Sequence, residues 1–66
     1  MKTPGWRERI STELEDLVRR LSALDLFLGT KDYQHLPFAQ KELLHQQRGV
    51  MRDYASILTQ RLALPD

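Results

Sequence analysis

The chain has no cysteine, two histidines, three glycines and three prolines among its 66 residues. Without cysteine it forms neither disulfides nor thiolate metal sites, and His35 and His45 are too few to build a structural zinc centre. A chain of this length buries only about 60% of its unfolded surface, so one folded copy is marginally stable. Because disulfides and metals are excluded, we expect self-association to supply the missing stability.

An excess of charge of one sign is also lacking, since ten basic and nine acidic residues leave a net charge of +1. The two signs are interleaved along the chain, so no basic face is available to neutralise phosphates and we expect no nucleic-acid partner. No run approaches the ~18 apolar residues that a membrane span needs, and no secretion signal is present. We therefore expect no membrane partner and a cytoplasmic location.

Apolar residues in the first half recur at alternating spacings of four and three, at Ile10, Leu14, Leu17, Leu21, Leu24 and Leu28. This repeat is typical of a helix that packs along a coiled-coil-like seam. Thr3 and Pro4 suit a cap and a first helical position, and Gly29 suits the left-handed residue that ends a helix. The pattern predicts a helix over about residues 4–28.

The segment GTKDYQHLP interrupts this repeat with glycine, threonine, aspartate and proline. It predicts a turn over residues 29–36, with a short helical turn at 32–35 and Leu36 packed under the bend. Pro37 has the geometry of a first helical residue. The apolar residues that follow predict a second helix over about residues 37–63.

Two helices of similar length with a short connection should fold back as an antiparallel hairpin, a single domain over residues 1–66. In that hairpin three pairs face one another: Leu24 and Leu44, Leu17 and Met51, and Ile10 and Leu58. A second stripe, rotated by roughly 60°, consists of Leu43, Gln47, Val50, Tyr54, Ile57 and Arg61. One partner helix cannot cover both stripes. We therefore expect an all-α hairpin that assembles into a homo-oligomeric helical bundle, as a dimer or a larger symmetric ring.

Three polar residues, Gln47, Tyr54 and Arg61, recur at one heptad position of the second stripe, where a buried polar group costs stability unless a partner satisfies it. One interpretation is that they specify the register and the oligomeric state. The other is that they line a wet crevice between protomers. There an aromatic face, an amide and a guanidinium would bind a small anionic ligand such as a nucleotide, with Arg9 or Arg20 also meeting phosphate. Both interpretations stay open.

Four further residues are candidates for contact with a partner. Gly49 inside a helix costs about 1 kcal/mol relative to alanine, and such a glycine is usually tolerated where another helix or a ligand approaches closely. Trp6 is expected at the open end of the hairpin, either as a cap on the core or as an exposed anchor. Tyr33 and Phe38 are the other aromatic residues that a partner would meet.

No catalytic residue, cofactor or metal site is predicted, and we expect a binding protein rather than an enzyme. No serine lies in a nucleophile context, and no pair of carboxylates is clearly placed in a cleft. Asp25 is expected to pair with the other helix, His35 to cap or to lie in the loop, and His45 to lie on the surface. The arginines of the first helix are expected to pair along that helix with Glu13, Glu15 or Asp16.

Three segments of the chain form an ordered pattern of a leucine-rich helix, a short turn and a polar second helix. They are LSALDLFLGTKDYQHLP, ELLHQQ, and the set Met51, Tyr54, Ile57, Leu58, Arg61 and Leu62. Over about residues 8–62 this pattern resembles a family of small phage helical-hairpin proteins, named after a reading frame of a crAss-like phage. The resemblance implies a phage or prophage origin and a two-helix hairpin. The chain departs from the family pattern at Pro37, Phe38 and Gly49.

Small oligomeric phage proteins often act against host defence, and by this analogy three functions are possible. In the first, protomers sequester a cyclic nucleotide or another nucleotide immune signal, with Tyr54 on a base and Arg61 on phosphate. In the second, the protein inhibits a host defence protein through Trp6, Tyr33 and Phe38. In the third, it is a structural or assembly accessory. We expect an anti-defence protein of the host cytoplasm, and we favour sequestration over inhibition.

Overall fold

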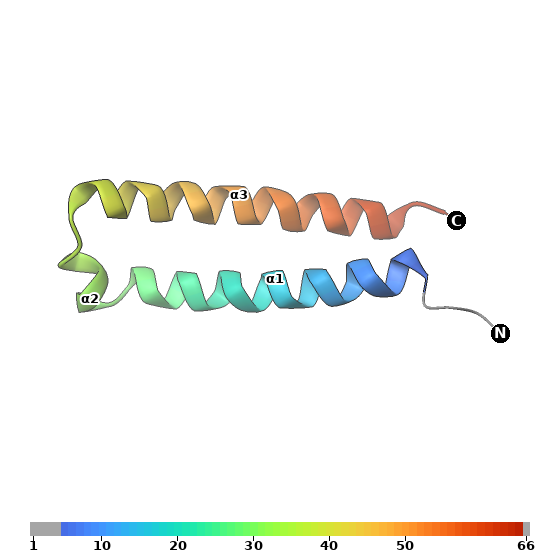
Figure 1. Ribbon diagram of the computed structural model, residues 1–66, viewed down its shortest axis with the longest axis horizontal. Helices are drawn as coiled ribbons and strands as arrows, with labels where there is room; N and C mark the ends of the chain where they lie inside the picture. The colour runs from blue at the N-terminus through green and yellow to red at the C-terminus, as the bar shows by residue number, and fades with distance from the viewer. Residues whose placement is uncertain (1–4, 66) are drawn as a thin grey trace.

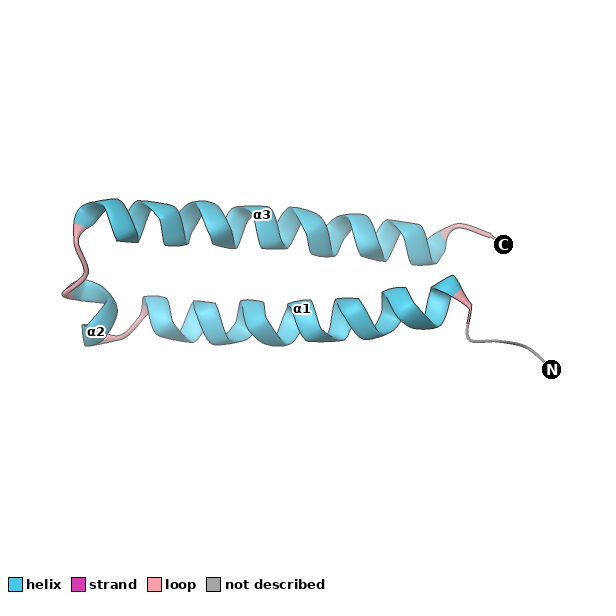
Figure 2. Cartoon of the chain, in the orientation of Figure 1, coloured by secondary structure: helices cyan, strands magenta, loops and turns pink. Residues whose placement is uncertain are grey.

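A computed structural model of the protein describes residues 5–65. Over this range the chain forms α1 (Trp6–Leu28), the short α2 (Lys31–Gln34) and α3 (Phe38–Ala63), and it contains no strand. Figure 1 and Figure 2 show α1 and α3 side by side and antiparallel, with α2 at the bend between them. The molecule is a rod with extents of 53 × 17 × 14 Å. The predicted all-α hairpin is therefore confirmed.

The first long helix, α1, begins at Trp6, slightly later than predicted. Gly5 precedes it with extended backbone (φ −78°, ψ 175°), and its carbonyl accepts from the Arg9 N–H at 3.4 Å. Because glycine has no side-chain oxygen, no side chain caps this end of the helix. The predicted cap at Thr3 and Pro4 lies outside the described residues.

The end of α1 corrects one prediction. Gly29 has φ −93° and ψ 6°, so it does not adopt the left-handed conformation that was predicted. Its N–H donates to the Leu26 carbonyl at 3.2 Å and tightens the last turn. A left-handed residue is unnecessary because Thr30 closes α1 and caps α2. Its hydroxyl donates to the Phe27 carbonyl at 2.6 Å and accepts from the Tyr33 N–H at 3.2 Å.

The bend contains the predicted helical turn, although α2 spans Lys31–Gln34 and so begins and ends earlier than expected. His35 follows as its cap, with Nδ1 2.7 Å from the carbonyl oxygen of the first α2 residue. Leu36 is half-buried, as expected for a residue packed at the bend. Pro37 is not the first helical residue, because its ψ of 151° is extended, and α3 begins at Phe38. The proline ring fixes φ but leaves ψ free.

The core is one narrow seam between α1 and α3. Among the described residues, the buried apolar side chains are Ile10, Leu17 and Leu58, and Leu58 is fully enclosed at 0% exposure. Five partly buried side chains pack against them: Trp6, Leu14, Met51, Ala55 and Leu62. These residues confirm the predicted seam toward the open end of the hairpin. A core this small agrees with the marginal stability expected of so short a chain.

Polar contacts near both ends of the seam fix the register of the two helices. At the open end, the guanidinium of Arg7 donates to the carbonyl of Leu62 at 2.8 Å and to that of Leu64. Toward the bend, Arg48 forms an ion pair with Asp25. The pairing predicted for Asp25 is thus confirmed. Because α3 cannot slide along α1 without breaking these contacts, the register is well defined.

Candidate functional site

A second row of side chains on α3 is left uncovered by α1. We call this row the outer stripe and define it as Leu43, Gln47, Val50, Tyr54, Ile57 and Arg61. All of them are exposed, and the exposed fractions of Val50, Leu43 and Ile57 are 67%, 58% and 52%. Apolar side chains gathered in this way mark an interaction surface. The prediction that one partner helix cannot cover both stripes is confirmed.

The polar residues of the outer stripe are widely spaced along α3. Gln47, Tyr54 and Arg61 follow one another at intervals of seven residues, so each is about 10 Å from the next along the helix axis. The distance from Gln47 to Arg61 is therefore about 21 Å. A ligand of nucleotide size seated on Tyr54 can approach one of these neighbours within the same chain. A site that uses all three needs a longer ligand or a second copy of the chain.

The hydroxyl of Tyr54 links the outer stripe to α1, because it donates to the carboxylate of Glu13. The residue nevertheless remains 39% exposed, so part of the side chain is open to solvent at the edge of the seam. A carboxylate is a strong acceptor for a phenol, and the contact therefore orients the ring. It also places a negative charge beside the position where an anionic ligand would stack.

The other two polar residues of the stripe differ in their surroundings. The Gln47 amide nitrogen lies 3.8 Å from the Met51 sulfur, which is a weak acceptor. Gln47 would therefore lose little by turning toward a ligand. Arg61 lies exposed in the last turn of α3, where the helix dipole favours a positive charge.

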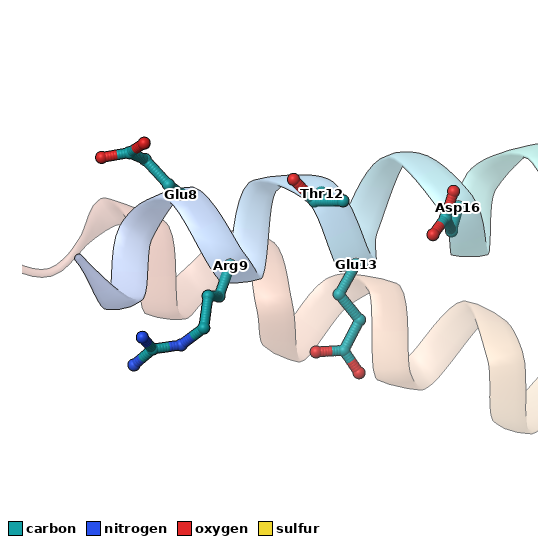
Figure 3. Close-up of a pocket in the computed structure, with 5 residues that line it drawn as sticks. All are labelled: Glu8, Arg9, Thr12, Glu13 and Asp16. Atoms are coloured by element: carbon teal, nitrogen blue, oxygen red, sulfur yellow. The ribbon is translucent and has the colours of Figure 1, made fainter. Parts of the chain in front are cut away.

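A depression on the outside of α1 is lined by Glu8, Arg9, Thr12, Glu13 and Asp16. Figure 3 shows Arg9 and Glu13 projecting to the same side of α1 and Glu8 projecting to the opposite side. Three carboxylates and one guanidinium line this surface, so by itself it repels anions more than it attracts them. Arg9 is one of the two α1 arginines that were predicted to contact phosphate, and it thus lies among acidic residues. Arg20 is exposed further along α1.

Residues 5–65 contain neither a metal-binding cluster nor a membrane-spanning helix. No group of three or more histidine, cysteine, aspartate or glutamate side chains gathers there in a way that could hold a metal ion. No helix in the same range is both long enough and apolar enough to cross a membrane.

Comparison with known protein families gives a match to Sequestin over residues 4–64, a span that includes both long helices and the bend. The chain belongs to the Sequestin family. No curated protein and no solved structure matches it. Since the Sequestin match runs through the whole hairpin, the outer stripe lies within the region that the chain shares with this family.

The aromatic residues predicted to contact a partner are scattered over the Sequestin hairpin. Trp6 packs against the core at the open end, and the Arg7 guanidinium lies 4.7 Å from the centre of its ring. Tyr33 lies at the bend, half-buried, with its hydroxyl 2.7 Å from Nε2 of His45. Phe38, also at the bend, is 75% exposed. These three side chains therefore do not form one continuous docking patch.

Gly49 lies in α3 with open space around it. No heavy atom would lie within 4 Å of a Cβ added at this position. The hairpin itself thus has no steric need for glycine here. The close approach predicted from Gly49 is not made within the chain, and it stays a prediction about a second molecule.

The contact of Glu13 with Tyr54 was not predicted from the sequence, where Glu13 was expected to pair with arginines of its own helix. A signal for the contact was present. The predicted pairing of Ile10 with Leu58 brings Glu13, about one turn along α1, level with Tyr54, about one turn back along α3. Pairs within one helix can be recognised from spacing alone, whereas pairs between helices require the register.

Proposed function

We propose that this Sequestin-family chain is a non-enzymatic, phage-type protein that counters host defence by sequestering a nucleotide immune signal between protomers in the host cytoplasm. The family name points to sequestration, and the resemblance to small phage hairpin proteins supports the origin. The observation that carries the proposal is the outer stripe, in which exposed apolar residues alternate with Gln47, Tyr54 and Arg61. A fully solvated face would not need the apolar residues, and polar residues at these positions can bind a ligand as well as specify the register of an assembly.

Self-association is the first part of the proposal. The hairpin leaves Leu43, Val50 and Ile57 exposed while its own core encloses few side chains. Burying each of these residues fully against another copy would contribute about 1.5–3 kcal/mol. The same contact would enclose the intervening polar residues, so a crevice between protomers would be formed by the assembly itself.

Ligand chemistry is the second part. In that crevice the Tyr54 ring would stack on a base, the Gln47 amide would exchange hydrogen bonds with the base edge, and Arg61 would pair with phosphate. Arg20 would supply further positive charge from α1, whereas the carboxylates around Arg9 oppose such a contribution from that arginine. Binding of this kind requires no bond to be made or broken, and the protein would act in proportion to the number of copies present.

Calorimetry tests the proposal directly. The unchanged protein is titrated with a panel of cyclic dinucleotides, cyclic trinucleotides and linear nucleotides. We expect saturable heat with at least one of them, and loss of most of that heat in Tyr54→Ala and Arg61→Ala. Arg52→Ala is the matched control, because Arg52 is an exposed arginine of α3 outside the outer stripe.

Light scattering or sedimentation on the same samples tests the assembly. Oligomers at micromolar concentration, together with heat that Arg52→Ala preserves, would support the proposal. A monomer throughout that range would remove the crevice between protomers. Equal loss of heat in Arg52→Ala and Arg61→Ala would show that the response is a general effect of charge.

Inhibition of a host defence protein is the second candidate, and the exposure of Phe38 favours it. An exposed phenylalanine at the first position of α3 is available to a partner at the bend. Absence of nucleotide heat, combined with a host protein whose capture is abolished by Phe38→Ala and kept by Trp6→Ala, would support this function. The separation of Trp6 from Phe38 makes one shared contact surface for both residues unfavourable.

A further inference from the structure

When the outer stripes of two copies are placed side by side and antiparallel, the apolar residues of one stripe face apolar residues of the other. From this we infer that α3 packs antiparallel against α3 of a second copy, with a two-fold axis beside Val50. The inference deepens the proposed function and rests on it for the use of the resulting crevice. Such a contact is isologous, meaning that both copies contribute the same surface.

The apolar residues of the stripe are placed symmetrically about Val50. Leu43 lies seven residues before it and Ile57 seven residues after it. In the reversed arrangement Val50 therefore faces Val50 of the second copy, and Leu43 faces Ile57 at both ends. All three side chains are more than half exposed in the single chain, so the contact covers apolar surface that the hairpin leaves open.

The polar residues obey the same symmetry. Gln47 lies three residues before Val50 and Tyr54 lies four residues after it. Gln47 of one copy is thus level with Tyr54 of the other, within about 1.5 Å along the axis. The dimer would contain two equivalent places where an amide and a phenol ring face each other across the interface. Each is a candidate half of the nucleotide crevice.

Charge distinguishes this arrangement from a parallel one. In a parallel, in-register pair of α3 helices, Arg61 would face Arg61 and Asp53 would face Asp53, and like charges at close range are unfavourable. In the antiparallel pair, Asp53 is level with Gln46 or Gln47 of the second copy and Arg61 is level with Ala39, so these two contacts between like charges are avoided. A shift of half a heptad would set Leu43 against Arg61 and Gln47 against Ile57. That register buries polar groups without partners.

Cross-linking through introduced cysteines tests the geometry, because the chain has no cysteine of its own. Val50→Cys is expected to oxidise to a disulfide-linked dimer. Leu43→Cys alone and Ile57→Cys alone are expected to remain monomeric under denaturing conditions, since identical positions would be about 21 Å apart along the axis, beyond the reach of a disulfide. An equal mixture of the last two variants should give the mixed dimer. Arg52→Cys, exposed and off the stripe, controls for random collision.

A charge exchange gives a second measurement that does not depend on oxidation. Leu43→Lys and Ile57→Glu should each shift the protein to monomer in sedimentation, because each places a lone charge in the apolar contact. The double variant should recover dimer, since the introduced lysine then faces the introduced glutamate of the second copy. Both positions are exposed in the hairpin, so the helical circular dichroism of each variant should be unchanged.

The outcomes separate this inference from the proposed function. The mixed dimer together with the Val50→Cys dimer supports the antiparallel contact, whether or not a nucleotide binds. Cross-linking of Leu43→Cys with itself, equal oxidation of Arg52→Cys and Val50→Cys, or failure of the double charge variant to recover dimer would overturn it. If calorimetry shows nucleotide binding while one of these contrary results is obtained, the proposed function holds but the copies associate through a different interface.

Discussion

The inner and outer faces of α3 follow the same heptad spacing but use their polar residues differently. On the inner face, Met51, Leu58 and Leu62 pack against α1, and the polar contacts lie at the edges of the seam. On the outer stripe, polar and apolar residues alternate at the centre of the face. The comparison shows that heptad spacing is shared by a face that α1 covers and by a face that α1 leaves exposed, and that polar residues lie at the centre of the exposed face alone.

The largest difference between the faces should appear at Leu58 and its neighbour Ile57. Leu58→Ala is expected to lower the free energy of unfolding by about 2–5 kcal/mol, because it leaves a cavity in the seam. Ile57→Ala is the matched control on the outer stripe and should lower stability only at protein concentrations where copies associate. Urea unfolding at several concentrations measures both. Equal losses of unfolding free energy in the two variants at every protein concentration would contradict the distinction between the inner and outer faces.

A substitution at Gly49 tests whether a second molecule contacts α3 at this position. Gly49→Ala should raise the free energy of unfolding by about 1 kcal/mol, because alanine favours the helix and the added Cβ meets no atom of the hairpin. Thermal unfolding and sedimentation together give the result. If the variant instead weakens association, a second molecule approaches at this position, as the sequence predicted.

Tyr54→Phe and Glu13→Gln test the hydrogen bond between Tyr54 of the outer stripe and Glu13 of α1. Removing the Tyr54 hydroxyl should cost about 0.5–1.5 kcal/mol of hairpin stability. Glu13→Gln keeps an acceptor for the phenol and should cost less. It also removes a negative charge beside the stacking position, so it should tighten binding of an anionic nucleotide in calorimetry. Weaker binding by Glu13→Gln would mean that the carboxylate itself contacts the ligand.

The smallest effect is expected at the ion pair on the edge of the seam. Asp25→Asn should lower stability by no more than about 1 kcal/mol, because the pair with Arg48 is partly exposed. Thermal unfolding at low and high salt measures it, and the difference from the unchanged protein should shrink as salt rises. A larger loss, independent of salt, would show that Asp25 does more than pair with a surface arginine.

Much of the hairpin could be predicted because its signals are local. The repeat of leucines gave the seam, and the bend followed from the cluster of glycine, threonine, aspartate and proline. The details of the bend could not be predicted, because Gly29 and Pro37 each allow more than one backbone conformation. The hydrogen bonds of Thr30 with Phe27 and Tyr33 determine which conformation Gly29 adopts. These bonds depend on the three-dimensional path of the chain.

The outer stripe could also be predicted, since its members follow from spacing and the structure leaves them exposed. The contact of Tyr54 with Glu13 was not predicted, because it follows from the register of the two helices and not from the spacing within either helix. The acidic neighbours of Arg9 could be predicted as well, because Glu13 lies four residues after it on the same helix. The sequence indicates which face of α3 is left exposed, and the fold determines which charges lie beside that face.

The hydrogen bonds of Arg7 with Leu62 and Leu64 join the beginning of α1 to the end of α3, where the helix ends would otherwise fray. One guanidinium binds the carbonyl of Leu62, which lies in the last turn of α3 and has no helical donor, and the carbonyl of Leu64, just after the helix. Opening that end must therefore release the beginning of α1 and the end of α3 together. Amide protons near Ile10 and Leu62 should consequently exchange with deuterium at similar rates, as parts of one cooperative unit.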